Sequence, residues 1–355
     1  MGYCGGMKEK VFVGLSGGVD SAVSAALLKS DGYDVIGAFI KIWQPEFIEC
    51  TWREDRLDAM RVCAALDIPF REIDLSENYR TDVIEDMISS YRSGMTPNPD
   101  VLCNTSIKFG SFMEWARENG AAYVATGHYA RTDRGSLLRG KDPNKDQSYF
   151  LHRLRSSELE HTLFPIGAYL KSEVRALAKR LGLPVADKAD SQGLCFAGAI
   201  TLAEFLSRYI QLQEGPVFDM SGKVVGSHEG AALYTRGQRH GFSISSASAK
   251  GAPHYVVSTD VSANTVTVSS DISDTFVTSV TIDDMHWIQG VPSLSRDFSM
   301  QARYREKPVG AAVTEVGGKY LVTFPSPHVA SPGQSLVIYD NEICLGGGNI
   351  SAAKI

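Results

Sequence analysis

The stretch V-F-V-G-L-S-G-G-V-D-S, residues 11–21, decides the fold of the first half of this 355-residue chain. It begins as an apolar, β-branched strand and enters a short glycine turn, and residues 19–28 after the turn suit a helix. Such a junction gathers backbone N–H groups at the positive end of a helix dipole, where anions bind. Two glycines let the main chain approach a phosphate closely, and Ser16 and Ser21 add hydroxyl donors. The stretch therefore predicts a phosphate-binding loop.

Two common phosphate loops do not fit this stretch. No Gly-Lys-Ser/Thr ends the turn, as a Walker loop requires, and no G-x-G-x-x-G follows the strand. The string S-G-G-V-D-S instead resembles the pyrophosphate loop (PP-loop) of the ATP pyrophosphatases, which cleave ATP between the α- and β-phosphates and adenylate a substrate. That resemblance implies ATP as the ligand.

The first half of the chain alternates strand-like and helix-like segments. The expected strands are residues 10–15, 34–40, 70–74 and 122–126, and the expected helices are residues 20–30, 55–66, 78–90, 106–119 and 171–181. This alternation predicts an α/β domain with a doubly wound parallel sheet, whose ligands bind at the carboxyl ends of the strands. Both the loop at 14–21 and Gly127-His128 follow such strand ends.

After about residue 210 short β-rich runs replace the helical periodicity. They cover residues 255–258, 265–268, 276–282, 300–304, 311–316, 320–324 and 335–339. Gly-Gly, Asn and Pro turns separate them, which is typical of a small β-barrel. We therefore expect an ATP-binding domain at residues 1–205, a small central domain at 206–270 and a C-terminal β-barrel at 271–355.

Composition and charge limit the class of protein. With 43% hydrophobic and 21% charged residues the chain is typical of a soluble globular protein, and no apolar run reaches the roughly 18 residues of a membrane helix. The net charge is −6, yet residues 131–182 carry eleven Lys/Arg and six Asp/Glu. A basic segment in an acidic protein suits a phosphate-facing surface, although ordinary solvated helix faces give the same balance.

The six cysteines are scattered, and none forms a C-x-x-C pair. The spacing indicates neither a disulfide framework nor a zinc ribbon, and it predicts a cytoplasmic, reducing environment. We expect no dedicated metal site. The export pattern of a basic and then apolar N-terminus is missing as well.

Two cysteines lie where chemistry can use them. Cys103 lies in the stretch M-T-P-N-P-D-V-L-C-N, residues 95–104. Its two prolines predict an extended loop, and we expect Asn104 or Thr105 to cap a helix that follows. A helix N-terminus lowers the pKa of a thiol. Cys195 lies in S-Q-G-L-C-F, in an expected loop. Each cysteine can alternatively be a small buried hydrophobe.

Seven motifs in order now carry a specific resemblance. They are G-L-S-G-G-V-D-S, N-P-D-V-L-C-N, A-T-G-H-Y-A-R, K-D-Q-S-Y-F-L, S-Q-G-L-C-F, Y-T-R-G-Q-R-H-G and S-P-G-Q-S-L-V-I-Y, spread over residues 11–350. The chain thereby resembles the tRNA-specific 2-thiouridylases of the MnmA family. It departs from the family pattern at Arg236 and Ile40, where an apolar residue and a methionine are common, and at residues 197–201, which lack charge.

The resemblance implies that the central domain at 206–270 contacts tRNA, and it implies roles for individual residues. It implies catalysis by Cys103 and Cys195, and ATP binding by Gly14, Leu15, Ser16, Gly17, Gly18, Val19, Asp20, Ser21, Ile40 and Gly127. It implies tRNA contacts by Asn98, Pro99, Asp100, Lys145, Asp146, Gln147, Arg303, Tyr304 and Gln334, and by His128 at the edge of the nucleotide site. From the residues alone, His128 can equally be a histidine packed at a strand end.

The implied reaction is ATP-dependent 2-thiolation of uridine 34, with Mg²⁺ on the ATP phosphates. The implied partners are the tRNAs for Lys, Glu and Gln and a sulfur carrier or cysteine desulfurase that donates persulfide. One alternative is another ATP pyrophosphatase, a ligase acting on a small metabolite, although such a ligase needs neither paired loop cysteines nor a terminal barrel. A second is a nucleotide-sensing RNA-binding protein that has lost catalysis, which the two intact cysteines disfavour.

Overall fold

A computed structural model describes residues 8–48, 52–190, 200–245 and 253–354. The chain divides into two compact units, each built from separate segments. Unit 1 comprises residues 1–83, 100–199 and 342–345, and unit 2 comprises residues 84–99, 200–341 and 346–355. Cys195 falls in the range 191–199, outside the described residues.

Unit 1 contains the expected parallel sheet. Its strands are β1 (Lys10–Gly14), β2 (Asp34–Lys41), β3 (Phe70–Asp74), β4 (Tyr123–Ala125) and β7 (Thr162–Leu163), in the spatial order β3-β2-β1-β4-β7. All four pairings are parallel. Val11, Phe12 and Val13 of β1 are buried because both faces of a central parallel strand are covered.

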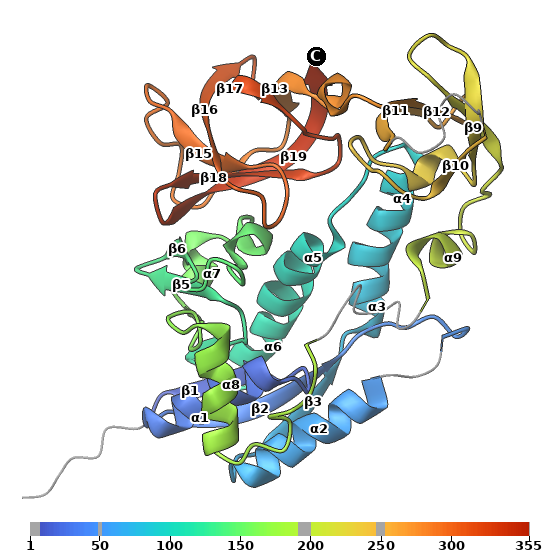
Figure 1. The fold of residues 1–355 in the computed structure, drawn as a ribbon. Coiled ribbons are helices and arrows are strands. Elements are labelled where there is room, and N and C mark those ends of the chain that lie inside the picture. Colours follow the sequence, from blue (N-terminus) through green and yellow to red (C-terminus); the bar gives the residue numbers. More distant parts are fainter. Residues whose placement is uncertain (1–7, 49–51, 191–199, 246–252, 355) are drawn as a thin grey trace, which may run out of the picture. The chain divides into compact units, whose positions relative to one another are not determined.

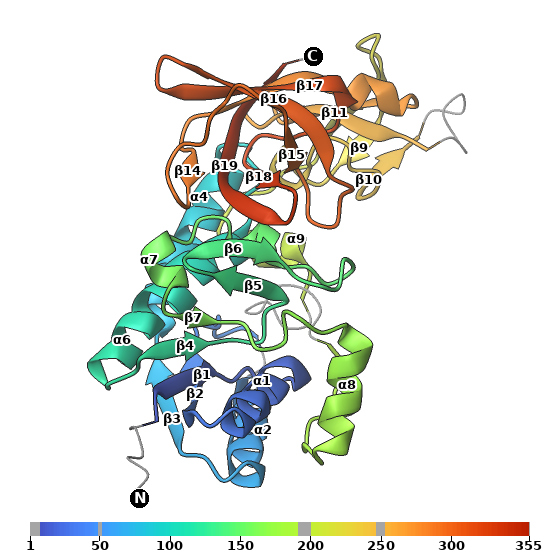
Figure 2. The ribbon, with the colours of Figure 1, turned by 90° about the vertical axis from the view of Figure 1, so that its left-hand side faces the viewer.

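Helices cover both faces of this sheet. Figure 2 shows α1 (Val19–Ser30) and α2 (Trp52–Ala65) on one side and α6 (Phe112–Glu118) on the other. The remaining helical segments of unit 1 are α3 (Ser76–Tyr79), η1 (Arg80–Glu85, which ends in unit 2), α5 (Pro99–Leu102), η2 (Cys103–Ser111), η3 (Ser148–Leu151), α7 (Ser156–Leu159) and α8 (Lys171–Arg180). The doubly wound α/β fold is thus confirmed, and four of the expected strands match β1 to β4.

Unit 1 also contains an antiparallel hairpin that the sequence pattern did not reveal. It joins β5 (Ala130–Asp133) to β6 (Ser136–Arg139), and β6 pairs with Ile343 and Cys344 near the end of the chain. The guanidinium of Arg131 also lies 2.7 Å from a carboxylate oxygen of Glu342.

Unit 2 holds two β structures and the helices α4 (Asp86–Arg92) and α9 (Leu202–Leu206) (Figure 1). The smaller sheet has the order β10-β9-β8-β12-β11 and is formed by β8 (Gly215–Phe218), β9 (Val224–His228), β10 (Phe242–Ile244), β11 (Tyr255–Asp260) and β12 (Thr265–Ser269). Its core includes Val217, Val256 and Val266. The short 3₁₀ segments are η4 (Ala231–Leu233) and η5 (Ile272–Thr275).

The larger structure is the expected C-terminal barrel. Its strands follow the order β13-β17-β16-β15-β18-β19, and β13 also pairs with β19, which closes the ring. They are β13 (Val277–Ile282), β15 (Phe298–Gln301), β16 (Val309–Val316), β17 (Lys319–His328), β18 (Ser335–Asp340) and β19 (Ile343–Lys354), with β14 (His286–Trp287) paired to β19. The three-domain boundaries drawn from the sequence stay a prediction.

Candidate active site

The loop after β1 has the geometry of an anion cradle. Gly17 has a φ of +72°, and a Cβ there would lie 2.4 Å from the carbonyl oxygen of Asp55, so only glycine fits. Gly18 is the N-cap of α1 in an extended conformation, and no side chain caps the helix. The first N–H groups of a 12-residue helix are therefore not covered by a side-chain cap.

Hydrogen bonds of two serine hydroxyl groups hold this loop in its conformation. The backbone N–H of Ser16 donates to Oγ of Ser21 at 3.2 Å, and the two Oγ atoms lie 3.3 Å apart. The Ser21 hydroxyl in turn donates to the carbonyl of Gly18 at 3.2 Å. Ser21 is buried, so it acts on loop shape, whereas Ser16 is exposed and can meet a ligand.

The other expected nucleotide residues border the same loop. A Cβ on Gly127 would lie 2.6 Å from the nitrogen of Ser21, so the strand end at Gly127 packs directly against the start of α1. A Cβ on Gly14 would lie 3.8 Å from Cδ1 of Ile40. Leu15 donates its N–H to the carbonyl of Ala38 at 2.8 Å. The structure thus brings Gly14–Ser21, Ile40 and Gly127 together at the carboxyl ends of β1, β2 and β4.

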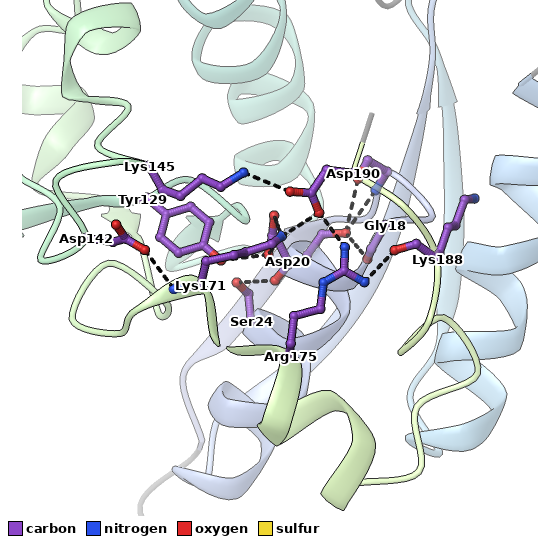
Figure 3. Close-up of polar contacts among 12 residues, drawn as sticks. Gly18, Asp20, Ser24, Tyr129, Asp142, Lys145, Lys171, Arg175, Lys188 and Asp190 are labelled. Atoms are coloured by element: carbon purple, nitrogen blue, oxygen red, sulfur yellow. Dashed lines mark hydrogen bonds and ion pairs between the residues drawn. The ribbon is translucent and has the colours of Figure 1, made fainter. Parts of the chain in front are cut away.

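Asp20, in the first turn of α1, is held by two groups that the sequence reasoning missed. The Tyr129 hydroxyl donates to its Oδ1 at 2.8 Å, and the Lys171 ammonium lies 2.8 Å from both carboxylate oxygens (Figure 3). Burial, together with the Asp20 charge, raises the pKa of Tyr129, so the phenol stays protonated and keeps donating. Asp142 fixes Lys171 by accepting its backbone N–H at 2.9 Å at the start of α8.

A second carboxylate, Asp190, gathers three cations beside Asp20. Its oxygens lie 2.8 Å from the Lys145 ammonium, 2.8 Å from that of Lys171 and 2.5 Å from the Arg175 guanidinium. Burial alone would raise the pKa of Asp190, but hydrogen bonds from Lys145 and Lys171 hold it well below its usual range. The only sequence signal for this cluster was the positive balance of residues 131–182.

The expected tRNA residues Lys145, Asp146 and Gln147 lie in unit 1 beside the same site. Lys145 points to Asp190, whereas Asp146 accepts hydrogen bonds from the N–H groups of Gly140 (2.9 Å) and Ser148 (3.1 Å). Gln147 Oε1 accepts the N–H of Tyr129 at 3.0 Å. Asp146 and Gln147 therefore stabilise the chain around Tyr129 in this structure.

His128 is packed at the strand end. It is 8% exposed, its Nδ1 lies 2.7 Å from the Thr126 hydroxyl, and its ring packs against Phe109 and Phe164. Burial, with a smaller contribution from Lys108, lowers its pKa well below the ordinary value, so the ring is neutral.

The expected helix cap at Asn104 or Thr105, just after Cys103, is wrong. A helix already begins at Pro99 and continues through the π-helical segment η2 and α6, so Cys103 lies four residues inside it and neither Asn104 nor Thr105 is a cap. Proline is favoured at the first helical position because its missing N–H is not needed there. Asn104 instead donates to the Phe150 carbonyl at 3.1 Å. The helix N-terminus therefore acts on Cys103 less than the sequence suggested.

Cys103 nonetheless lies in an unusual environment. The residue is 6% exposed and lies one helical turn after Asp100. Burial raises the pKa of the Asp100 carboxyl, and the Lys108 ammonium offsets part of that effect. A carboxyl with a raised pKa therefore lies one helical turn before the thiol.

In unit 2, the segment before Asn98 and Pro99 is tied to the barrel. The Thr96 hydroxyl lies 2.7 Å from that of Thr235, and Thr96 donates its N–H to Pro332 at 3.2 Å. Gln334 Nε2 donates to the Thr96 carbonyl at 2.7 Å. The expected tRNA residue Gln334 thus positions the chain that leads to Asn98 and Pro99.

Arg303 and Arg236 form a second cluster in unit 2. The Arg303 guanidinium donates to the Arg236 carbonyl at 2.6 Å, and the Arg236 side chain reaches the Thr275 carbonyl at 3.4 Å. Burial lowers the pKa of Arg236, which remains a cation at neutral pH. Tyr304 is partly exposed, with the Arg305 guanidinium 5.2 Å from its ring.

Among the described residues, no group of three or more His, Cys, Asp or Glu could hold a metal ion. The described helices are all too short or too polar to cross a membrane.

Comparisons with known proteins cover the chain from residue 9 to residue 350. Residues 9–199 match the tRNA methyl transferase HUP domain, residues 203–270 the tRNA methyl transferase PRC-barrel domain, and residues 277–350 the aminomethyltransferase beta-barrel domain. A solved 4-thiouridine synthetase–RNA complex with bound ATP is 19% identical with a TM-score of 0.35, and covers 56% of this chain and 50% of that one. That score is too low to support an argument.

Full-length relatives are more informative. The tRNA-specific 2-thiouridylase MnmA of Paracidovorax citrulli is 42% identical, covering 98% of this chain and 97% of its own length. That of Geobacillus thermodenitrificans is 43% identical, covering 97% of this chain and 95% of its own. Identity at this level over nearly the full length of both proteins shows common descent of the whole chain. The chain belongs to the MnmA family of tRNA-specific 2-thiouridylases.

Proposed function

We propose that this protein is a tRNA 2-thiouridylase that uses ATP to replace O2 of uridine 34 with sulfur. The observation that carries the proposal is the loop of residues 14–21, with its uncapped helix and its Asp20 held by Tyr129 and Lys171. An anion-binding helix end with cations beside it suits a triphosphate. The expected substrates are the tRNAs for Lys, Glu and Gln, and the expected compartment is the cytoplasm.

The first chemical step is adenylation. The uridine O2 attacks the α-phosphate of ATP, the bond to the β-phosphate breaks, and pyrophosphate leaves. Mg²⁺ accompanies the ATP phosphates as part of the substrate. Gly17, Gly18 and Ser16 bind phosphate oxygens, and the cations near Asp20 offset the charge that develops on pyrophosphate. The product is a base whose C2 is electrophilic and carries AMP as a leaving group.

The second step delivers sulfur. Cys195 accepts a persulfide from a carrier protein or cysteine desulfurase. In one route the Cys103 thiolate attacks C2 directly and expels AMP. An external thiol then reduces the Cys195 persulfide, and the hydrosulfide released displaces Cys103 from C2. In the other, the Cys103 thiol displaces the terminal sulfur of the Cys195 persulfide, a disulfide forms, and hydrosulfide attacks C2. In this second route sulfur then displaces AMP, and an external thiol reduces the disulfide.

The residues assigned to tRNA divide between two groups. Asn98, Pro99 and Asp100 meet the target base, which must leave its stack to expose C2. Lys145, Asp146, Gln147 and His128 in unit 1, and Arg303, Tyr304 and Gln334 in unit 2, contact other parts of the tRNA or shape those contacts.

The decisive experiment measures products with unmodified tRNA. We expect AMP and pyrophosphate only when tRNA and ATP are both present, and 2-thiouridine by nucleoside mass spectrometry once a persulfide donor is added. Two of the matched domain descriptions mention methyl transfer, so S-adenosylmethionine is tested in parallel. The proposal would be refuted by ADP as the product, by AMP release that does not depend on tRNA, or by a methylated base.

A further inference from the structure

Three cations in unit 1 contact the carboxylate of Asp190. None of the roles assigned above explains why they gather there. Lys145, Lys171 and Arg175 come from a loop and from the first two turns of α8, and all reach Asp190 within 2.8 Å (Figure 3). Like charges so close together repel unless an anion lies between them. Asp190 is that anion here, and its side chain is only 26% exposed.

The cluster adjoins the phosphate loop directly. The Lys171 ammonium contacts Asp190 at 2.8 Å and also both oxygens of Asp20, which lies in the first turn of α1. A triphosphate bound at the N-terminus of α1 would therefore come close to Lys171. It carries more negative charge than one carboxylate and offers several oxygens to each cation.

The three cations are not equivalent. Arg175 also donates to the backbone carbonyls of Ala186 and Lys188, at 3.1 and 2.5 Å, so it anchors the chain leading to Asp190. Lys145 and Lys171 end in a single flexible ammonium group each. They can turn to another anion while Arg175 keeps Asp190 in place.

We infer that Asp190 is an internal counter-ion that holds Lys145 and Lys171 until a nucleotide binds, and that both lysines then move to the β- and γ-phosphates and stay with pyrophosphate. The inference rests on the proposed use of ATP. It gives Lys145 a phosphate ligand in place of the tRNA contact implied by resemblance. Asp190 competes with the ligand, and this competition weakens nucleotide binding and eases pyrophosphate release.

Calorimetric titration of the full-length protein with pyrophosphate, and separately with α,β-methylene ATP, tests this without tRNA. Asp190→Asn should lower the Kd for pyrophosphate about fivefold, because Lys145 and Lys171 both lose the Asp190 carboxylate. Asp20 still contacts Lys171 in this variant, so the larger part of the gain should come through Lys145. Lys145→Ala and Lys171→Ala should each raise it about tenfold. The matched control is Asp187→Asn, which breaks the exposed pair with Lys179 (3.0 Å) in the same segment and should leave the Kd unchanged.

A double-mutant cycle separates competition from folding effects. In a Lys145→Ala background, Asp190→Asn should gain less affinity than in the wild type, because one of the two lysines it restrains is gone. An unchanged or raised Kd in Asp190→Asn, or an equal gain in both backgrounds, overturns the inference. Should Asp190→Asn not fold, normal pyrophosphate affinity in both lysine variants overturns it too.

The outcome is independent of thiolation itself. If the pyrophosphate results come out as expected but tRNA yields no AMP, the proposed function fails and the counter-ion role stands. If AMP and 2-thiouridine form but Asp190→Asn does not change the Kd for pyrophosphate, the proposed function stands and the counter-ion role fails.

Discussion

The Tyr129 hydroxyl donates a 2.8 Å hydrogen bond to Oδ1 of Asp20, and so ties the chain after β4 to the first turn of α1. The two residues are 109 positions apart, and both follow the carboxyl ends of neighbouring parallel strands. This bond fixes the orientation of the carboxylate closest to the anion-binding helix end.

Tyr129→Phe should therefore slow adenylation while leaving the fold intact. Loss of one hydrogen bond to a charged group costs about 1.5 kcal/mol, which is about tenfold in rate. The measurement is tRNA-dependent AMP release at saturating ATP. Tyr123→Phe, in the same sheet with its ring packed edge-on against Tyr33, is the control and should retain wild-type rates. Equal rates in both variants would show that Asp20 needs no such support.

Cys103→Ser should separate the two chemical steps. The serine hydroxyl is a far weaker nucleophile at neutral pH, so 2-thiouridine should fall below detection while ATP binding and AMP formation continue. Cys63→Ala is the control, because burial raises the pKa of that thiol to about 11 and keeps it inert. Cys195→Ser should abolish loading of labelled persulfide, which Cys103→Ser retains. Normal thiolation by either serine variant would remove that cysteine from the mechanism.

Gly333→Ala should destabilise unit 2 through a backbone collision. A Cβ at this position would lie 2.6 Å from the nitrogen and 2.8 Å from the carbonyl oxygen of Thr96. Gly222→Ala controls for left-handed strain, since Gly222 has a similar φ of +82° and a Cβ there would meet nothing within 4 Å. We expect a loss of about 1 kcal/mol for Gly222→Ala and about 2 kcal/mol more for Gly333→Ala. Urea unfolding monitored by circular dichroism measures both, and equal losses would argue against the collision.

The stability of the protein should depend on pH through Asp100. Burial raises its folded-state pKa above the ordinary 3.8, so the native state binds the proton more tightly than the unfolded chain does. The contribution of Asp100 is then fully present below 3.8 and is lost as the pH rises through the raised pKa. Asp100→Asn, which cannot ionise, should gain stability relative to wild type across that window and hold the gain above it. Urea unfolding in half-unit pH steps measures the difference, and a difference independent of pH would contradict the assignment.

The sequence predicted the ligand loop better than its surroundings. Residues 11–21 combine a buried strand, two glycines and a helix start, and each of these local signals points to the same structure. The elements Phe70–Asp74 and Lys171–Arg180 were likewise found within a residue, and Gly182 and Pro184 mark the end of the second. In contrast, only the fold brings together Tyr129, Lys171 and Asp190. Lys171 and Asp20 are 151 residues apart, and no local sequence pattern predicts a contact over that separation.

The errors have similar physical causes. The stretch P-N-P-D, residues 97–100, predicted a loop because its two prolines were counted against a helix, yet Pro99 occupies the one helical position that favours proline. The 12-residue strand β19 went unnoticed because its sequence, I-C-L-G-G-G-N-I-S-A-A-K, has three consecutive glycines and no regular alternation. Its pairing with β13 and other strands supplies the order that its own residues do not.

The pairing of β6 with Ile343 and Cys344 has a consequence for biosynthesis. Leu137 and Leu138 pair with these residues and leave the ribosome about 200 residues before them. At about 5–20 residues per second, the edge of β6 therefore stays unpaired for on the order of 10–40 s during synthesis. The barrel in unit 2 also stays open until late in synthesis, because residues 350–354 of β19 close it by pairing with β13. A premature stop shortly before residue 342 would therefore leave both units with an exposed strand edge, and such edges promote aggregation. A nascent chain of this protein therefore needs protection until residues 343–354 are made.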